Sequence, residues 1–163
     1  DSESSINPNA YEIRDGIDNN CDGEIDEGYQ GLSYPEDVDG NTYDFAIYGN
    51  QYWTLENAEM VTYRDGTPIP EITDLTEWVN LTTGAWCYYD NDPAKGKLYN
   101  WYAAAGIHDN DPNTPNKELA PEGWHVPSEA EWTNLENHLI VSGYNYDGTN
   151  TGNLIAKSMA SHT

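Results

Sequence analysis

The excess of acidic over basic side chains is the feature that most restricts how this chain can fold. Its 163 residues include 29 Asp and Glu but only 6 Lys and Arg, which gives a formal net charge of −23. Most carboxylates therefore have no basic partner within the chain, and we expect external cations to compensate them. The 6 Trp and 13 Tyr supply large rings that can build a core, so the acidity does not indicate disorder.

The same imbalance excludes several classes of function. Nucleic-acid binding requires clustered Lys and Arg, whereas the basic residues here are scattered between Arg14 and Lys157. An anionic membrane surface would repel the chain for the same reason. No run of about 18 apolar residues is present, so no membrane span is expected. The length favours one domain with room for a small appendage.

Residues 15–28 carry acidic and amide side chains at regular spacing. Counted from Asp18, the segment matches the first nine positions of an EF-hand calcium loop, in which the ligands at positions one, three, five, seven and nine are Asp18, Asn20, Asp22, Glu24 and Asp26. Alternate side chains converge on one point, and Gly23 at position six permits the turn that directs the Glu24 carbonyl inward. The spacing predicts a calcium ion on this loop, with a solvated acidic linker as the alternative.

The end of the loop departs from the EF-hand pattern. Position twelve should be a bidentate Glu, but Tyr29 stands there, so Glu27, Asp15 or water has to supply the missing oxygen. The segment resembles the MopE-type metal-binding motif of bacterial surface proteins, C-D-G-x-D-N-x-C-D-G-x-x-D-E-G. Every position agrees except the first Cys, which is Arg14 here.

Local patterns predict several elements in the rest of the chain. Residues 42–49 and 50–57 indicate two strands joined at Gly49-Asn50, and 84–92 a strand that runs into an acidic turn. Capping-box patterns at 74–77 and 128–131 predict a short helix and a longer helix through about residue 141. Residues 98–106 favour a short aromatic helix that ends at Gly106. We expect the tryptophans to lie mainly in the core.

Residues 37–163 resemble the Fibrobacter succinogenes major paralogous domain. The resemblance rests on ordered matches such as L-Y-N-W-Y-A at 98–103 and G-W-H-V-P-S-E-A-E-W at 123–132. The second stretch also looks like formylglycine-generating enzyme domains. The resemblance implies a loop-rich α+β fold of the C-type-lectin-like, formylglycine-generating-enzyme-like kind. Since the family domain usually continues beyond the position of Thr163, we expect the chain to be truncated at its C-terminus.

The two resemblances divide the chain into three parts. These are a linker at 1–10, an acidic calcium-binding motif at 11–30, and the N-terminal part of the major paralogous domain at 31–163. The families also have cysteines at the positions of Arg14 and Ala120, so Cys21 and Cys87 have each lost an expected partner. The resemblance thus implies a Cys21–Cys87 disulfide, with two free thiols as the alternative.

The expected function is not enzymatic. No nucleophile or metalloprotease motif is present, and His125 is interpreted as a structural residue at a helix entry. The resemblance implies secretion and display at a bacterial cell surface. We therefore expect a calcium-stabilised extracellular module that acts in adhesion, or as a subunit of a filament or surface complex, through a protein partner or self-assembly. The alternatives are a carbohydrate-binding, lectin-like adhesin and an enzyme-associated domain whose active half is missing.

Three further acidic turns could hold a second calcium ion. They are Asp37/Asp39, Asp90/Asn91/Asp92 and Asp109/Asn110/Asp111. The alternative is that these side chains cap their own turns.

Overall fold

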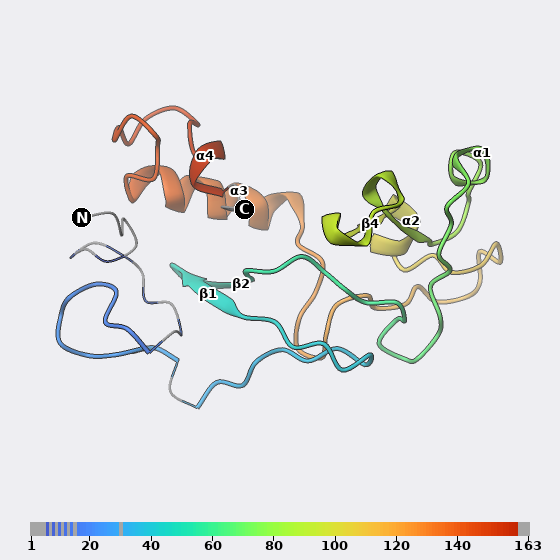
Figure 1. Cartoon of the computed structure of the whole chain (residues 1–163), viewed down its shortest axis with the longest axis horizontal. Coiled ribbons are helices and arrows are strands. Elements are labelled where there is room, and N and C mark those ends of the chain that lie inside the picture. The colour runs from blue at the N-terminus through green and yellow to red at the C-terminus, as the bar shows by residue number, and fades with distance from the viewer. Residues whose placement is uncertain are drawn as a thin grey trace. The chain divides into compact units, whose positions relative to one another are not determined.

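The computed structural model describes residues 6, 8, 10, 12, 14, 16–29 and 31–159 (Figure 1). Its elements in chain order are β1 (Phe45–Tyr48), β2 (Gln51–Thr54), α1 (Leu75–Trp78), β3 (Trp86–Tyr88), the 3-10 turns η1 (Tyr89–Asn91) and η2 (Pro93–Lys95), β4 (Lys97–Tyr99), α2 (Trp101–Ala104), α3 (Glu129–Val141) and α4 (Ala156–Met159). Strands β1 and β2 form one two-stranded sheet, and β3 and β4 form another. The predicted α+β class is confirmed.

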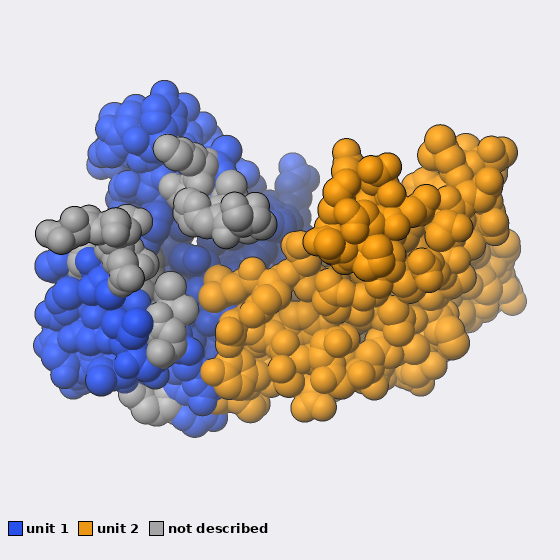
Figure 2. Space-filling view, in the orientation of Figure 1, with its two compact units in different colours: residues 1–31, 45–53, 127–163 blue, residues 32–44, 54–126 orange. Residues whose placement is uncertain are grey.

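Two compact units divide the chain (Figure 2). Unit 1 contains residues 1–31, 45–53 and 127–163, and unit 2 contains residues 32–44 and 54–126. The acidic segment therefore belongs to the same unit as β1 and α3. None of the helices formed by the described residues is long and apolar enough to cross a bilayer.

Unit 1 is built on the helix α3. The predicted capping box at its start is confirmed, because Ser128 Oγ accepts a hydrogen bond from the Glu131 amide and the Glu131 carboxylate accepts one from the Ser128 amide. Its buried residues Leu135 and Leu139 form a small core with Ile155. The rings of Trp53 and Trp132 also meet in this unit, with centroids 4.6 Å apart.

Unit 2 holds the larger core. Its buried members are Tyr43, Met60, Tyr63, Ile69, Trp86, Ala103 and Leu119. Trp86 buries its indole and still satisfies the ring N–H, which donates to the carbonyl of Ile69 at 3.0 Å. Strand β3 pairs antiparallel with β4, which places Trp86 opposite Tyr99 and Tyr88 opposite Lys97. Trp101 departs from the expectation for tryptophans, because its side chain on α2 is 68% exposed.

The stretch 98–106 is not one helix, as the pattern predicts, but the end of β4 followed by α2. Asn100 causes the change, since its side-chain oxygen accepts hydrogen bonds from the amides of Ala103 at 2.9 Å and Ala85 at 3.1 Å. The first bond caps α2, and the second ties the cap to the residue that precedes β3. Long-range pairing with β3 thus converts the first residues of this stretch into a strand.

The expected Cys21–Cys87 disulfide is absent from the structure, in which both cysteines are free thiols. Cys21 is exposed on the acidic loop of unit 1, whereas Cys87 lies on β3 of unit 2. The expectation arose from missing partners in the sequence, and such an argument contains no information on the Cα separation that a disulfide requires.

Candidate metal centre

The acidic loop is curled by hydrogen bonds from its own backbone to its ligand-type side chains. The two carboxylate oxygens of Asp18 accept from the amides of Asp22 at 3.1 Å and Gly23 at 2.9 Å. Asn20 Oδ1 accepts from the Asp22 amide at 2.9 Å, and Asp22 Oδ1 accepts from the Glu24 amide at 3.0 Å. Gly23 has φ 99°, a conformation that only glycine adopts without strain. The spacing seen in the sequence therefore produces a continuous curled loop.

Beside these hydrogen bonds, the side-chain oxygens of the loop still have lone pairs that could bind a cation. A carboxylate has about four lone-pair positions, and each Asp of this loop uses only some of them on backbone amides. The loop also contributes an amide oxygen and backbone carbonyls, which calcium accepts as ligands. The side chain of Glu24 is exposed, so this residue can serve the site through its carbonyl oxygen, as position seven requires.

Glu27 provides the clearest sign that the loop lacks a positive charge. Its Oε1 accepts a hydrogen bond from the side-chain amide of Asn20, at position three of the loop. Its Oε2 is buried, and no group in the described part of the chain donates a hydrogen bond to it. A buried carboxylate oxygen without a partner is costly, so a cation beside it would relieve a real deficit. The residues present therefore fit a metal ion.

The structure brings the candidate ligands together only in part. Asp18, Asn20 and Asp22 are linked through shared amides, and Asn20 links them to Glu27. Asp26 instead accepts from the Gly16 amide at 3.1 Å, and Asp15 lies outside the described residues. Among the residues described, no three His, Cys, Asp or Glu side chains are grouped so that they could hold a metal ion. Binding must therefore draw the ligand oxygens closer together.

Glu12 is a residue of this site that the motif does not identify. Its side chain is buried, and its carboxylate accepts from the amides of Asn20 at 2.9 Å and Asp26 at 3.1 Å. It thus joins two points of the loop from a position that precedes it. The only signal in the sequence is one more acidic residue ahead of the motif, and nothing in the spacing distinguishes Glu12 from a solvated carboxylate.

Asp37 and Asp39 are structural acceptors rather than a preformed cation site. Asp37 accepts four hydrogen bonds, from the amides of Asp39 and Asn41, the Asn41 side chain and the Tyr43 hydroxyl. Asp39 accepts from the amides of Val61 and Thr62 and from the Thr62 hydroxyl. Burial opposes ionisation of Asp37, but the bonds from Tyr43 and Asn41 outweigh it and hold its pKa below the ordinary value of 3.8.

Asp37→Asn is expected to destabilise unit 2 by about 2 kcal/mol at pH 7, because hydrogen bonds to an ionised acceptor are lost. A depressed folded-state pKa stabilises the fold above the unfolded value, and this contribution disappears as the pH falls from 3.8 through the lower folded value. Urea denaturation at pH 7 and below pH 4 measures both effects. Glu36→Gln, at an exposed neighbour, should change neither, and equal stability of the two variants would contradict the assignment.

The carboxylates of the other two acidic turns have partners within the protein. Asp90 and Asp92 form ion pairs with Lys95 at 3.3 and 3.9 Å. Asp109 accepts from the Asp111 amide at 3.0 Å, and Asp111 accepts from the Asn113 amide at 2.9 Å. Asp92 also accepts from the Ala94 amide at 3.1 Å, so Asp92, Asp109 and Asp111 show the capping arrangement that was the alternative to a second calcium site.

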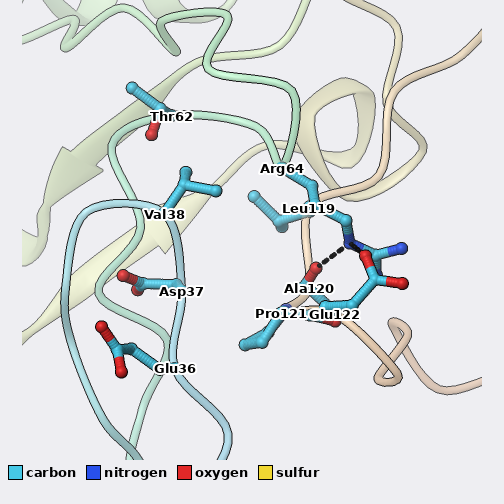
Figure 3. Close-up of a pocket in the computed structure, with 9 residues that line it drawn as sticks. All are labelled: Glu36, Asp37, Val38, Thr62, Arg64, Leu119, Ala120, Pro121 and Glu122. Carbon is cyan, nitrogen blue, oxygen red and sulfur yellow. Dashed lines mark hydrogen bonds and ion pairs between the residues drawn. The ribbon is translucent and has the colours of Figure 1, made fainter.

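A cavity of about 430 Å³ lies in unit 2 (Figure 3). It is lined by Glu36, Asp37, Val38, Thr62, Arg64, Leu119, Ala120, Pro121 and Glu122. The Arg64 guanidinium donates to the carbonyls of Ala120 at 2.9 Å, Pro121 at 2.8 Å and Trp124 at 2.7 Å. Figure 3 shows the carboxylates of Glu36 and Asp37 pointing away from this guanidinium. Arg64 instead pairs with Glu122 at 3.8 Å, so the charged groups of the lining serve the local fold and do not all converge on one point.

The protein is small and loop-rich, and its fold is of the α+β class. Its acidic loop, near the N-terminus, has the ligand spacing of a metal-binding segment. Comparison with protein families agrees with both parts. Residues 47–163 match the Fibrobacter succinogenes major domain, and residues 1–27 match the MopE-type metal-binding motif. Because the first match covers more than half of the chain, the chain belongs to the Fibrobacter succinogenes major domain family. Neither the curated proteins nor the solved structures gave a match.

Proposed function

We propose that this chain is a non-enzymatic, secreted module of a bacterial cell surface, in which calcium bound to the acidic loop stabilises the fold. The buried Oε2 of Glu27, for which the described residues offer no hydrogen-bond partner, lies in a loop with calcium-ligand spacing and is the observation that carries the proposal. The metal-binding motif matched at residues 1–27 supports it. A C-type-lectin-like fold for the complete domain is part of the same proposal, since it follows from the family resemblance.

Calcium suits these donors better than a transition metal does. The loop offers carboxylate, amide and carbonyl oxygens, which are hard ligands that calcium prefers. The name of the matched motif refers to copper, but copper favours imidazole nitrogen and sulfur ligands. Residues 16–29 contain no histidine and only one sulfur, that of Cys21.

Titration calorimetry with CaCl2 is expected to show binding by the unmodified chain and at least tenfold weaker binding by Asp22→Ala. The substitution removes a ligand at position five and also the acceptor for the Glu24 amide. Asp147→Ala is the matched control, because Asp147 accepts from the Thr149 amide in a similar exposed turn outside the loop. We expect its affinity to equal that of the unmodified chain.

The same titrations with MgCl2 and CuCl2 test the identity of the metal. Tighter binding of copper than of calcium would contradict the assignment of calcium, but the loop would still be a metal site. The absence of calcium binding by both the unmodified chain and Asp22→Ala would overturn the proposed role of the loop.

The charge of −23 favours a role in which the module works with cations and a protein partner. The described part of unit 2 keeps its basic side chains engaged, since Arg64, Lys95, Lys97 and Lys117 all form ion pairs with acidic residues. Most of its other described carboxylates face solvent, whereas Asp37 is buried. A partner at the cell surface, or a second copy of the chain, would therefore contact an acidic surface, and calcium would reduce the repulsion.

One observation favours carbohydrate binding as a second candidate function. The rings of Trp53 and Trp132 meet at an angle of 53° with 4.6 Å between their centroids, and Trp132 is 43% exposed. Exposed aromatic faces of this kind suit the apolar face of a sugar ring. A glycan array distinguishes a lectin-like adhesin from a scaffold module.

A further inference from the structure

The acidic loop contacts the sheet of unit 1 in a way that the motif does not predict. Tyr29 stands at position twelve, where an EF-hand has its bidentate ligand. Its side chain is only 2% exposed, and its hydroxyl donates to the backbone carbonyl of Glu12 at 2.8 Å. The same hydroxyl takes a hydrogen bond from the backbone of Ile47 in β1.

Tyr29 therefore joins the acidic segment to β1 at several points. Its ring meets that of Phe45, with centroids 5.3 Å apart. Next to it, a Cβ placed at Gly28 would lie 3.6 Å from the side chain of Ile47, which shows how closely the loop approaches the strand. The position that would bind metal in an EF-hand is used here to attach the loop to the core of the unit.

Glu12 completes the connection. Its backbone carbonyl is held by Tyr29, while its carboxylate is held by the amides of Asn20 and Asp26, which are positions three and nine of the loop. Its side chain is 8% exposed. One buried residue thus connects the metal loop at two positions to the residue that anchors the loop on β1.

We propose that Glu12 and Tyr29 are positioning residues that couple metal binding on the loop to the packing of the loop against β1 of unit 1. The coupling rests on the proposed calcium function. When calcium draws the ligand oxygens together, Asn20 and Asp26 are held at the spacing that Glu12 bridges, which favours the docked position of Tyr29. By linkage, the docked loop binds calcium more tightly than a detached one.

Calcium titration of Glu12→Gln tests the first half of the proposal. Gln keeps the size of the side chain but loses the charge and one of the two carboxylate acceptors, so we expect about tenfold weaker calcium binding, as for other residues that orient metal ligands. Glu36→Gln is the matched control, because it removes the same charge from an exposed residue of unit 2 and should bind calcium as the unmodified chain does. Unchanged affinity in Glu12→Gln would overturn the role of Glu12.

Tyr29→Phe tests the second half. It keeps the ring against Phe45 and removes only the hydroxyl that joins Glu12 to β1, so we expect about fivefold weaker calcium binding. Calcium should also slow amide hydrogen exchange in β1 of the unmodified chain much more than in Tyr29→Phe. Exchange in β3 of unit 2 should not depend on calcium, and slow exchange in α3 of unit 1 reports whether the unit that carries each substitution is folded.

The outcomes separate the two proposals. If the unmodified chain binds no calcium, the proposed function fails and the coupling fails with it. If calcium binds but leaves exchange in β1 unchanged, the proposed function stands and the coupling is wrong. If Glu12→Gln does not fold, which loss of slow exchange in α3 of the same unit would reveal, the comparison of Tyr29→Phe with the unmodified chain decides.

Discussion

Gly84→Ala is expected to destabilise unit 2 by about 3 kcal/mol, the cost of inserting an extra methyl group into a packed core. The new Cβ would overlap the hydroxyl of Tyr63 and would lie 2.9 Å from the Cα of Ala103. Neither neighbour can move easily, because Tyr63 and Ala103 are both completely buried. Urea denaturation followed by tryptophan fluorescence measures the loss, and the midpoint should fall while the slope stays constant.

Tyr63→Phe supplies the control for this prediction. The Tyr63 hydroxyl is buried, and no hydrogen-bond partner for it exists in the described part of the chain, so its removal should be neutral or slightly stabilising. In the Tyr63→Phe background the Gly84→Ala substitution should cost less, because the overlapping oxygen is gone while the contact with Ala103 remains. Equal costs in the two backgrounds would show that the clash with the hydroxyl is not the cause.

Asn145→Ala is expected to destabilise unit 1 by about 3 kcal/mol, because several partly buried backbone groups of one loop lose the same buried partner together. The Asn145 side-chain amide donates to the carbonyls of Thr149 at 2.9 Å, Gly152 at 3.1 Å and Thr151 at 3.3 Å. Its oxygen accepts from the Leu154 amide at 2.9 Å. This one side chain closes the loop 145–154, and the loop delivers Ile155 to the core of α3.

Asn153→Ala is the matched control for Asn145. Asn153 lies in the same loop but is exposed, and its side chain makes one hydrogen bond, to Glu136 at 3.2 Å. Its loss should change the free energy of unfolding by less than about 0.5 kcal/mol. Thermal unfolding and limited proteolysis between residues 145 and 154 compare the two variants. If both melt at the same temperature, Asn145 does not organise the loop.

Signals confined to a few neighbouring residues were read correctly from the sequence. The capping residues Asp74 and Ser128 both begin helices, since a cap depends only on amides two or three positions away. The curl of the loop after Asp18 follows from the same kind of local bond, between side-chain oxygens and the next amides. The family matches confirm the two resemblances for the same reason, because both rest on short ordered motifs.

Signals that depend on distant partners were not available in the sequence. Strand β4 exists because Tyr99 pairs with Trp86, whereas the local pattern favoured a helix over all of 98–106, of which only Trp101–Ala104 forms one. Trp101 itself is exposed, although composition favoured burial of such rings. The disulfide expected between Cys21 and Cys87 is absent. The expectation came from two missing partner cysteines in the sequence, which carry no information on the distance between the two thiols.

The sequence by itself determined the acidic loop, its ligand spacing and the capped helices, since each of these is encoded within a short run of neighbouring residues, and it determined the family through the ordered matches over residues 47–163. Only the tertiary structure decided which carboxylates are already used. Asp37 accepts from its own turn and from Tyr43, and Asp39 accepts from residues 61 and 62, whereas a buried oxygen of Glu27 has no hydrogen-bond partner among the described residues. It also decided that Glu12 and Tyr29 attach the loop to β1. Spacing fixes which oxygens can meet a cation, but burial and long-range hydrogen bonds decide which of them still need one.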